Sequence, residues 1–165
     1  MTDDRLPTHQ ERLKGILRPG AKESEAEETE VSCGAFGYWR GVRDLPGSLE
    51  FRFLAGNSVY FPYVLLGQWK YNPSEGLLLK FSGDLIYLVL LRGSNLDKPL
   101  AEGSINLTSG GLQRNRVVWI REMSKEDIQT VGDSGPTVDS IQVEGFESQA
   151  ALKEWLTKNA PAFLR

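Results

Sequence analysis

Residues 48–91 read SLEFRFLAGNSVYFPYVLLGQWKYNPSEGLLLKFSGDLIYLVLL, and this stretch decides the fold. At its start, Leu49, Phe51 and Phe53 alternate with charged residues, the period of two that is typical of a half-buried β-strand. Turn-forming residues, such as those at 73–76, separate the apolar segments that follow. We therefore expect strands at residues 48–54, 59–64, 65–72, 77–81 and 85–91.

The connections between these segments are short. Parallel strands need crossovers of roughly a dozen residues or more, whereas antiparallel strands can follow one another through tight turns. The sequence therefore predicts a mainly β fold of the α+β class, with five strands in a coiled antiparallel sheet or a small closed barrel. Residues 117–121 (VVWIR) have the pattern of one more strand.

The segment between Leu85 and Leu91 (LIYLVLL) is apolar on both faces. Both faces of such a strand need cover, and the interior of a barrel covers only one of them. The second cover is the N-terminal helix, the C-terminal region or another subunit. We expect self-association, with a homo-oligomer formed through residues 85–91.

The flanks divide the chain into three parts. Residues 1–30 contain a helix predicted at 11–18 and a glutamate-rich linker at 21–30, which has no large apolar residue to bury. Residues 31–122 form the β-rich core domain. Residues 123–165 form a C-terminal α/β extension packed on the core, with a helix capped by Ser124, a polar loop at 133–140, a short strand at 141–143 and a helix at 148–158.

The composition is that of an ordinary globular protein, with 40% hydrophobic residues, 25% charged residues and a net charge of −3. Basic residues outnumber acidic ones between 48 and 122, which is compatible with an anionic ligand but far from the dense basic stripe of a strong nucleic-acid binder. With Cys33 as the one cysteine, no intramolecular disulfide can form. No secretory signal and no apolar run near the ~20 residues of a spanning helix is evident. We expect a cytoplasmic protein with no membrane partner.

Several catalytic chemistries are excluded by the residues themselves. His9 is the only histidine, so neither a histidine-dependent triad nor a multi-histidine metal site can form within one chain. A single cysteine excludes a thiolate zinc site, and no phosphate-cradling glycine loop occurs. We predict no catalytic residues, no metal site and no cofactor, with paired carboxylates as the one remaining acid–base alternative.

The densest basic group surrounds the predicted strand at 117–121. Arg114, Arg116 and Arg121 lie there, and arginine is suited to bidentate contacts with phosphate. Aromatic residues such as Trp69 and Trp119 could stack on bases, although aromatic residues on strands belong more often to the core. Arg114 and Arg116 are therefore candidate ligand-binding residues, with an ordinary solvated surface as the alternative.

The sequence Leu91-Arg92-Gly93-Ser94-Asn95-Leu96 resembles the second signature of the Sm-like RNA-binding proteins, in which an apolar strand runs into Arg-Gly. The alternation at 49–53 and the turn at Gly56 are similar to the family's first signature, so the resemblance covers residues 49–96. It implies a small Sm-like or SH3-like barrel and a pocket for an RNA base on a ring of subunits. By position, Arg92, Gly93 and Asn95 would belong to that pocket.

The chain departs from this family in two places. The family has an Asp and Asn pair in the loop that contacts the base, and here only Asn72 stands near that position. In the family a final strand follows Arg-Gly at once, whereas Pro99 interrupts this chain. The stretches 63–66, 72–74 and 92–96 together also resemble short bacterial proteins with no assigned activity.

Two main hypotheses follow. The leading one is a non-enzymatic interaction or assembly module that self-associates. The alternative is an RNA-binding scaffold, in which Arg92, Gly93 and Asn95 hold single-stranded RNA and Arg114 or Arg116 contacts phosphate. An enzyme that uses carboxylates is the third and weakest hypothesis.

Overall fold

Strands in two sheets form the framework of the computed structural model, which describes residues 30–39, 46–100 and 105–165. The fold is mainly β and of the α+β class, as the sequence predicts. The helix expected at 11–18 lies outside the described residues, as does the acidic linker except for Glu30, which begins the first strand.

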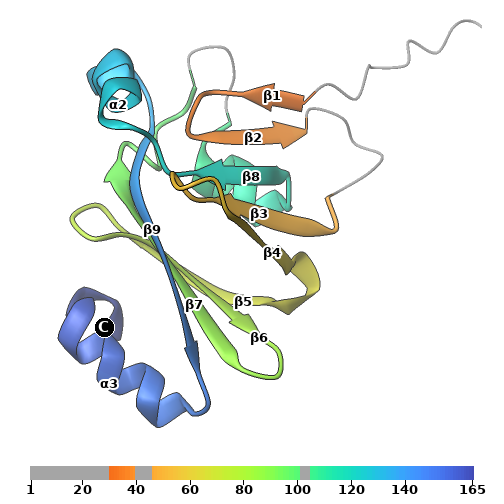
Figure 1. Ribbon diagram of the computed structural model, residues 1–165, viewed down its shortest axis with the longest axis vertical. Helices are drawn as coiled ribbons and strands as arrows, with labels where there is room; N and C mark the ends of the chain where they lie inside the picture. The colour runs from red at the N-terminus through yellow and green to blue at the C-terminus, as the bar shows by residue number, and fades with distance from the viewer. Residues whose placement is uncertain (1–29, 40–45, 101–104) are drawn as a thin grey trace, which may run out of the picture.

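The first sheet has the strand order β1-β2-β8-β3-β4 (Figure 1). All neighbours in it are antiparallel except β3 and β8, which run parallel with Phe51 opposite Ile120. The chain between β3 and β8 includes most of the second sheet, so this connection is long enough for the two strands to pair in parallel. The strands are β1 (Glu30–Ser32), β2 (Phe36–Trp39), β3 (Ser48–Arg52), β4 (Ser58–Pro62) and β8 (Val117–Arg121).

The second sheet has the strand order β5-β6-β7-β9 and is antiparallel throughout. Its first three strands follow one another through short turns, as expected. The strands are β5 (Leu66–Asn72), β6 (Gly76–Ser82), β7 (Ile86–Ser94) and β9 (Thr137–Phe146).

A corner at Pro62 and the 3₁₀ turn η1 (Tyr63–Leu65) leads the chain from the first sheet into the second. Pro62 ends the edge strand β4, where a missing N–H breaks no ladder hydrogen bond. The hydroxyl of the buried Tyr63 donates to the carbonyl oxygen of Val117 at 2.6 Å and holds the corner against β8. The five predicted strands are thus all present as β3 to β7, but they divide between two sheets. They do not form the single five-stranded sheet or closed barrel that the sequence led us to expect.

The main core fills the space between the two sheets, whose strands run across one another in Figure 1. Phe51 and Phe61 of the first sheet meet Phe81 of the second. The rings of Phe61 and Phe81 are stacked with centroids 4.5 Å apart, and the ring of Phe51 meets that of Phe81 edge-on at 6.2 Å. These aromatic contacts hold the sheets together, since such pairs add to the free energy gained by burying their area.

The connection from β7 to β8 contains a five-residue π-helical turn, η2 (Leu107–Gly111), and the 3₁₀ turn η3 (Leu112–Arg114). Asn106 begins η2, and its side-chain oxygen accepts the amide hydrogen of Gly110 at 3.0 Å. Leu107 and Leu112 lie in the main core, so residues 105–116 of this connection pack as part of the domain.

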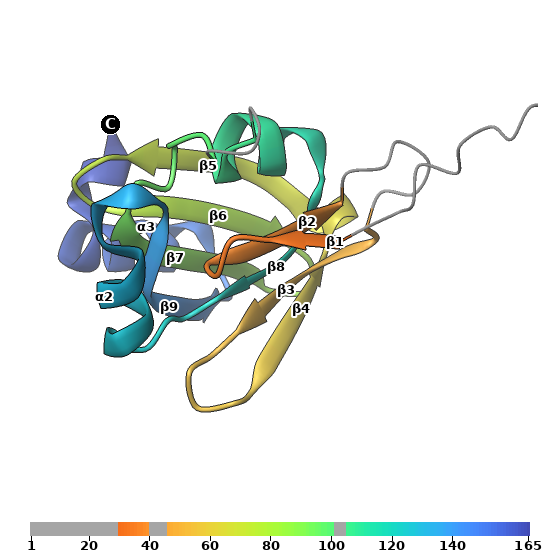
Figure 2. The same ribbon diagram turned by 90° about the horizontal axis from the view of Figure 1, so that it is seen from above.

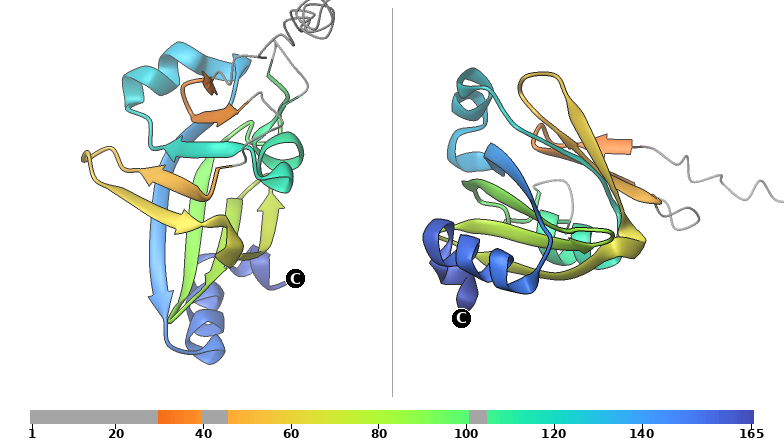
Figure 3. Two further views of the ribbon diagram at one scale, coloured as in Figure 1. Left: turned by 90° about the vertical axis from the view of Figure 1, so that its right-hand side faces the viewer. Right: turned by 60° about the horizontal axis from the view of Figure 1, so that its bottom comes forward.

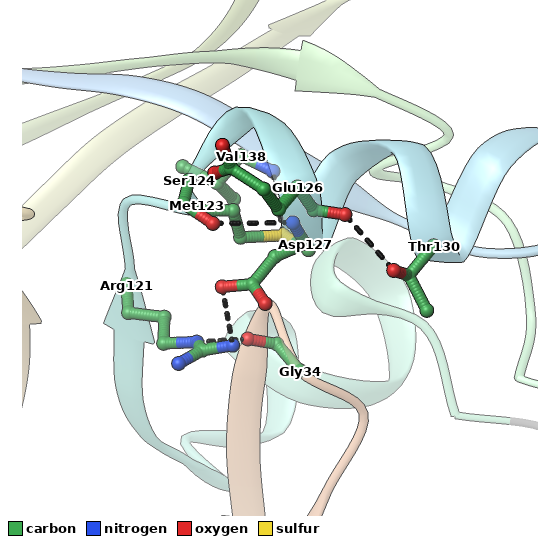
Figure 4. Close-up of polar contacts among 8 residues, drawn as sticks. All are labelled: Gly34, Arg121, Met123, Ser124, Glu126, Asp127, Thr130 and Val138. Atoms are coloured by element: carbon green, nitrogen blue, oxygen red, sulfur yellow. Dashed lines mark hydrogen bonds and ion pairs between the residues drawn. The ribbon is translucent and has the colours of Figure 1, made fainter.

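The helix predicted after Ser124 is α2 (Lys125–Val131), which is followed by the 3₁₀ turn η4 (Gly132–Ser134). Figure 4 shows that the Ser124 hydroxyl accepts the amide hydrogen of Asp127, at 3.1 Å, as an N-cap does. Arg121 at the end of β8 pairs with the Asp127 carboxylate at 3.3 Å and also donates to the carbonyl oxygen of Gly34. Arg121 therefore joins β8, α2 and the β1–β2 turn and is not a free basic group.

The C-terminal helix is α3 (Gln149–Asn159), capped by Ser148 as predicted and followed by the 3₁₀ turn η5 (Pro161–Leu164). The preceding strand differs from the expectation, because β9 has ten residues where a polar loop and a three-residue strand were predicted. The β7–β9 register shifts between Arg92 and Gly93, opposite Ser140 and Val138. That irregularity interrupts the alternation of apolar residues and conceals the first half of β9 in the sequence.

Strand β7 is covered on both faces by its own chain. Val89 and Leu91 lie in the main core, and Leu88 and Leu90 lie in a second core formed with α3. Figure 2 shows α3 on the side of the second sheet that faces away from the first sheet. The C-terminal region is therefore the second cover that the sequence required. The four residues from Leu88 to Leu91 are at most 2% exposed, so they offer no surface to a second copy of the chain.

Candidate ligand-binding groove

Figure 3 shows α3 beside the sheet formed by β5, β6 and β7. A groove of about 280 Å³ lies between α3 and the outer face of these strands, and we call it the α3 groove. The side chains that form its floor are determined by the alternation of residues along β6. Leu77 and Leu79 point into the main core, so Leu78 and Lys80 lie on the opposite face of β6. The groove is thus an apolar trough with one wall of sheet and one wall of helix; its central leucines are Leu78, Leu88, Leu152 and Leu156.

Three lysines surround this trough: Lys70 of β5, Lys80 of β6 and Lys153 of α3. The Lys80 ammonium donates to the side-chain oxygen of Gln149 at 3.3 Å and thereby ties the sheet to the first turn of α3. The Lys70 ammonium donates to the carbonyl oxygen of Phe163 at 2.8 Å. Lys153 is exposed, and its ammonium has no hydrogen-bond or ion-pair partner within residues 30–39, 46–100 and 105–165.

No carboxylate side chain lines the α3 groove within the part of the chain that the structure describes. Lys80 bonds to the neutral side-chain oxygen of Gln149, which leaves its charge uncompensated, whereas Lys70 bonds to the main-chain oxygens of Phe163, at 2.8 Å, and of Arg165, at 3.4 Å. Glu154, the residue after Lys153, pairs instead with Lys158 at 3.0 Å on the exposed side of α3. The groove therefore combines an apolar floor with a positive rim, an arrangement that attracts anions.

Arg92, predicted as a ligand-binding residue, is engaged within the fold. Its guanidinium donates to the carbonyl oxygen of Asn159 at 3.2 Å, at the C-terminal end of α3, and lies 3.9 Å from the Glu75 carboxylate. A cation at a helix C-terminus interacts favourably with the helix dipole. Arg92 therefore fastens α3 to β7.

Gly93 and Asn95, the other two residues of the predicted pocket, also have structural roles. A Cβ at position 93 would lie 1.9 Å from the carbonyl oxygen of Thr137, so only glycine permits the approach of β9. Asn95 adopts a left-handed conformation, with φ of 57°, and its side chain donates to the carbonyl oxygen of Gly135 at 3.1 Å. Together these contacts explain the Arg-Gly-Ser-Asn sequence as the end of β7 and the turn after it.

Arg114 and Arg116 lie in a different element, the turn η3 and the residue pair before β8. Arg114 is exposed and Arg116 is half-buried. No hydrogen bond or ion pair among the described residues joins either of them to Arg92 or Asn95. The structure therefore places the five predicted residues in two separate elements, with no direct bond between the two groups among the described residues.

The outer face of the first sheet carries a separate polar network. Arg52 lies over the ring of Trp119, 4.5 Å from its centroid, and pairs with the Glu50 carboxylate at 2.8 Å. The hydrogen bond from Arg52 holds the pKa of Glu50 below its usual value, and the Ser58 hydroxyl also donates to this carboxylate at 2.8 Å. Because Arg52 and Glu50 satisfy each other, we do not place the ligand site on this face.

Other chemistry-bearing groups do not form a site. The half-buried thiol of Cys33 has a pKa raised by burial, so it is a poor nucleophile. No group of three His, Cys, Asp or Glu side chains that could hold a metal ion occurs among the described residues. Within the same residues, no helix has the length and apolar character needed to cross a membrane.

The α3 groove was not predicted from the sequence, although the sequence pattern of its sheet wall, β5 and β6, indicates a polar face. In the segment 65–72 the polar Gln68 and Lys70 alternate with Trp69 and Tyr71, and Lys80 interrupts an apolar run, so polar side chains on one face of β5 and β6 could have been inferred. The amphipathic α3 was predicted, but the surface beneath it was not. The site arises only where these distant segments meet.

Comparison of the chain with protein-family models, with curated proteins and with solved structures gave no match. The likeness to Sm-like proteins thus rests on the motif at 91–96 and the alternation at 49–53, and the assignment of a ligand site rests on geometry alone.

Proposed function

We propose that this protein is a non-enzymatic binding module whose ligand is an anion held in the α3 groove. The observation that supports this proposal is the gathering of three lysines around an apolar trough, which no carboxylate side chain of the described residues lines. Ligand sites are typically concave and largely apolar, with a few polar groups that fix the orientation of the ligand. The α3 groove has these properties.

The alternative to an anion-binding role is that the lysines only cover apolar surface with their methylene stems. Lys70 and Lys80 border the groove together with Leu78, where their stems are placed to do this. Nevertheless, each keeps ammonium hydrogens free, because an ammonium has three donors and Lys80 uses one of them on Gln149. Lys153 contributes a third charge from the helix side, where covering the sheet does not require it.

Two earlier hypotheses receive less support than the groove. Binding of single-stranded RNA by Arg92 and Asn95 would require these side chains to leave their contacts with Asn159 and Gly135. A homo-oligomer through residues 85–91 would require α3 to leave Leu88 and Leu90. The groove needs no such rearrangement, so we give it priority as the ligand site.

Fluorescence titration with anilinonaphthalene sulfonate, an anionic apolar dye, tests the proposal. We expect the folded protein to bind the dye, and we expect the double variant Lys80→Gln/Lys153→Gln to bind it about tenfold more weakly with a smaller dependence on salt. Each lost ion pair is worth up to about 1 kcal/mol, and about 1.4 kcal/mol corresponds to a tenfold change in affinity.

Lys158→Gln is the matched control, because Lys158 lies on the same helix and faces away from the groove. We expect this variant to bind the dye like the unmodified protein. Equal dye affinity in all three proteins, with unchanged thermal unfolding, would count against the groove as an anion site.

A further inference from the structure

We infer that the ligand of the α3 groove is an alkyl carboxylate, held by its carboxylate between Lys80 and Lys153 with its chain along the leucine trough. This inference rests on the proposed function and adds the class of ligand, its orientation and a limit on its size.

The carboxylate end follows from the positions of the lysines. Lys80 bonds to Gln149, and Lys153 follows Gln149 by one turn on the same face of α3, so both lysines lie beside the N-terminal half of the helix. A carboxylate accepts several hydrogen bonds at once, and bonds between charged partners are shorter and stronger than neutral ones. Two ammonium groups with free donors therefore suit one carboxylate.

The alkyl body follows from the floor. Leu78, Leu88, Leu152 and Leu156 border the groove, but each is only 2–8% exposed, so the apolar surface open to water consists of the edges of these side chains and of Leu164, which is 40% exposed. An inorganic anion would occupy the charged end and leave this surface in contact with water. An alkyl chain removes apolar surface from water on both sides of the contact, which stabilises the complex roughly in proportion to its length.

The direction of the chain follows from the opposite end of the groove. There the Lys70 ammonium donates to the main-chain oxygens of Phe163 and Arg165, so its charge is engaged with η5 and the residue after it, unlike those of Lys80 and Lys153. Phe163 and Leu164 of η5 complete this end, and Leu164 remains 40% exposed. The chain therefore runs from the charged end at Lys80 and Lys153 to the apolar end at Leu164.

The size of the groove limits the length of the chain. Its volume of about 280 Å³ lies just below the range of roughly 300–1,000 Å³ that is usual for ligand pockets. The structure thus favours a chain of short to medium length over a large lipid or a polycyclic compound.

Calorimetric titration with butanoate, hexanoate, octanoate and decanoate tests the inference. We expect the affinity to rise by about two- to fourfold per methylene until the trough is filled, since only part of each methylene is buried in an open groove. Leu164→Ser should reduce the gain for decanoate and leave butanoate unaffected. Octanol should bind about tenfold more weakly than octanoate, because it lacks the charge.

The controls separate this inference from the proposed function. If acetate or inorganic phosphate bound as tightly as octanoate, the groove would remain an anion site and the alkyl carboxylate would be excluded. If octanol bound as tightly as octanoate, both the inference and the proposed anion site would be overturned. The acids are kept below the concentrations at which they form micelles, so any binding measured is binding of the dissolved acid. If the protein bound vesicles containing fatty acid but no dissolved acid, the inference would be overturned in favour of an anionic lipid surface.

Discussion

At the scale of single residues, position 93 has no room for a side chain. A Cβ there would lie 1.9 Å from the carbonyl oxygen of Thr137 and 3.0 Å from the Cα of Val138, both of them backbone atoms of β9. Backbone in a paired strand cannot yield as the end of a flexible side chain can. We expect Gly93→Ala to lower the free energy of unfolding by about 3 kcal/mol, the upper end of the usual cost of overpacking, as measured by urea denaturation.

Gly83→Ala is the matched control for this change. A Cβ at position 83 would meet nothing nearer than the Leu65 side chain at 3.6 Å, which is ordinary contact. We expect it to change the free energy of unfolding by less than about 0.5 kcal/mol. If the two variants had the same urea midpoint, the close approach of β7 and β9 would not be the reason for glycine at 93, and a ligand contact at this glycine would again deserve a test.

At the scale of elements, Glu122 joins segments that are far apart in the sequence. One oxygen of its carboxylate accepts the amide hydrogen of Leu54 at the β3–β4 turn, and the other accepts that of Ile141 in β9, each at 2.8 Å. We expect Glu122→Gln to lower the free energy of unfolding by about 1.5–3 kcal/mol, because one of the two donors would face an amide NH₂ and lose its charged acceptor. Hydrogen exchange of the Leu54 and Ile141 amides should also become faster.

Asp139→Asn is the control for Glu122→Gln. Asp139 is an exposed acidic residue of β9, the strand that also contains Ile141. This variant changes the net charge by the same amount, so any effect of net charge alone should appear in both. A loss of stability in Asp139→Asn as large as that in Glu122→Gln would show that the carboxylate bridge is not the cause.

The elements also show how far the sequence could predict this fold. The alternation at Leu49, Phe51 and Phe53 and the short turns after it predict the strands β3 to β7. The partner of β8 could not be predicted, because the pattern of Val117–Arg121 fits any sheet, and its parallel place beside β3 depends on packing of the whole chain. The three lysines of the groove come from β5, β6 and α3, and no spacing in the sequence relates them.

At the scale of the whole molecule, each face of the second sheet is covered by the chain itself. The first sheet covers one face, and α3 with η5 covers part of the other. We therefore expect light scattering to give the molar mass of a single chain over a wide range of concentrations. Leu156→Asp should weaken the packing of α3 on Leu88 and Leu90, and we expect this variant to associate as its concentration rises because an apolar sheet face becomes accessible.

A mass of several chains in the unmodified protein, unchanged by Leu156→Asp, would contradict this expectation and place a subunit contact away from α3. The distinction matters for ligand binding, because α3 both covers β7 and forms one wall of the α3 groove. In a single chain the groove stays open to solvent, so the affinity for octanoate should not depend on protein concentration. In an oligomer built on α3 the groove would be closed by the second copy, and the measured affinity would fall as the protein becomes more concentrated.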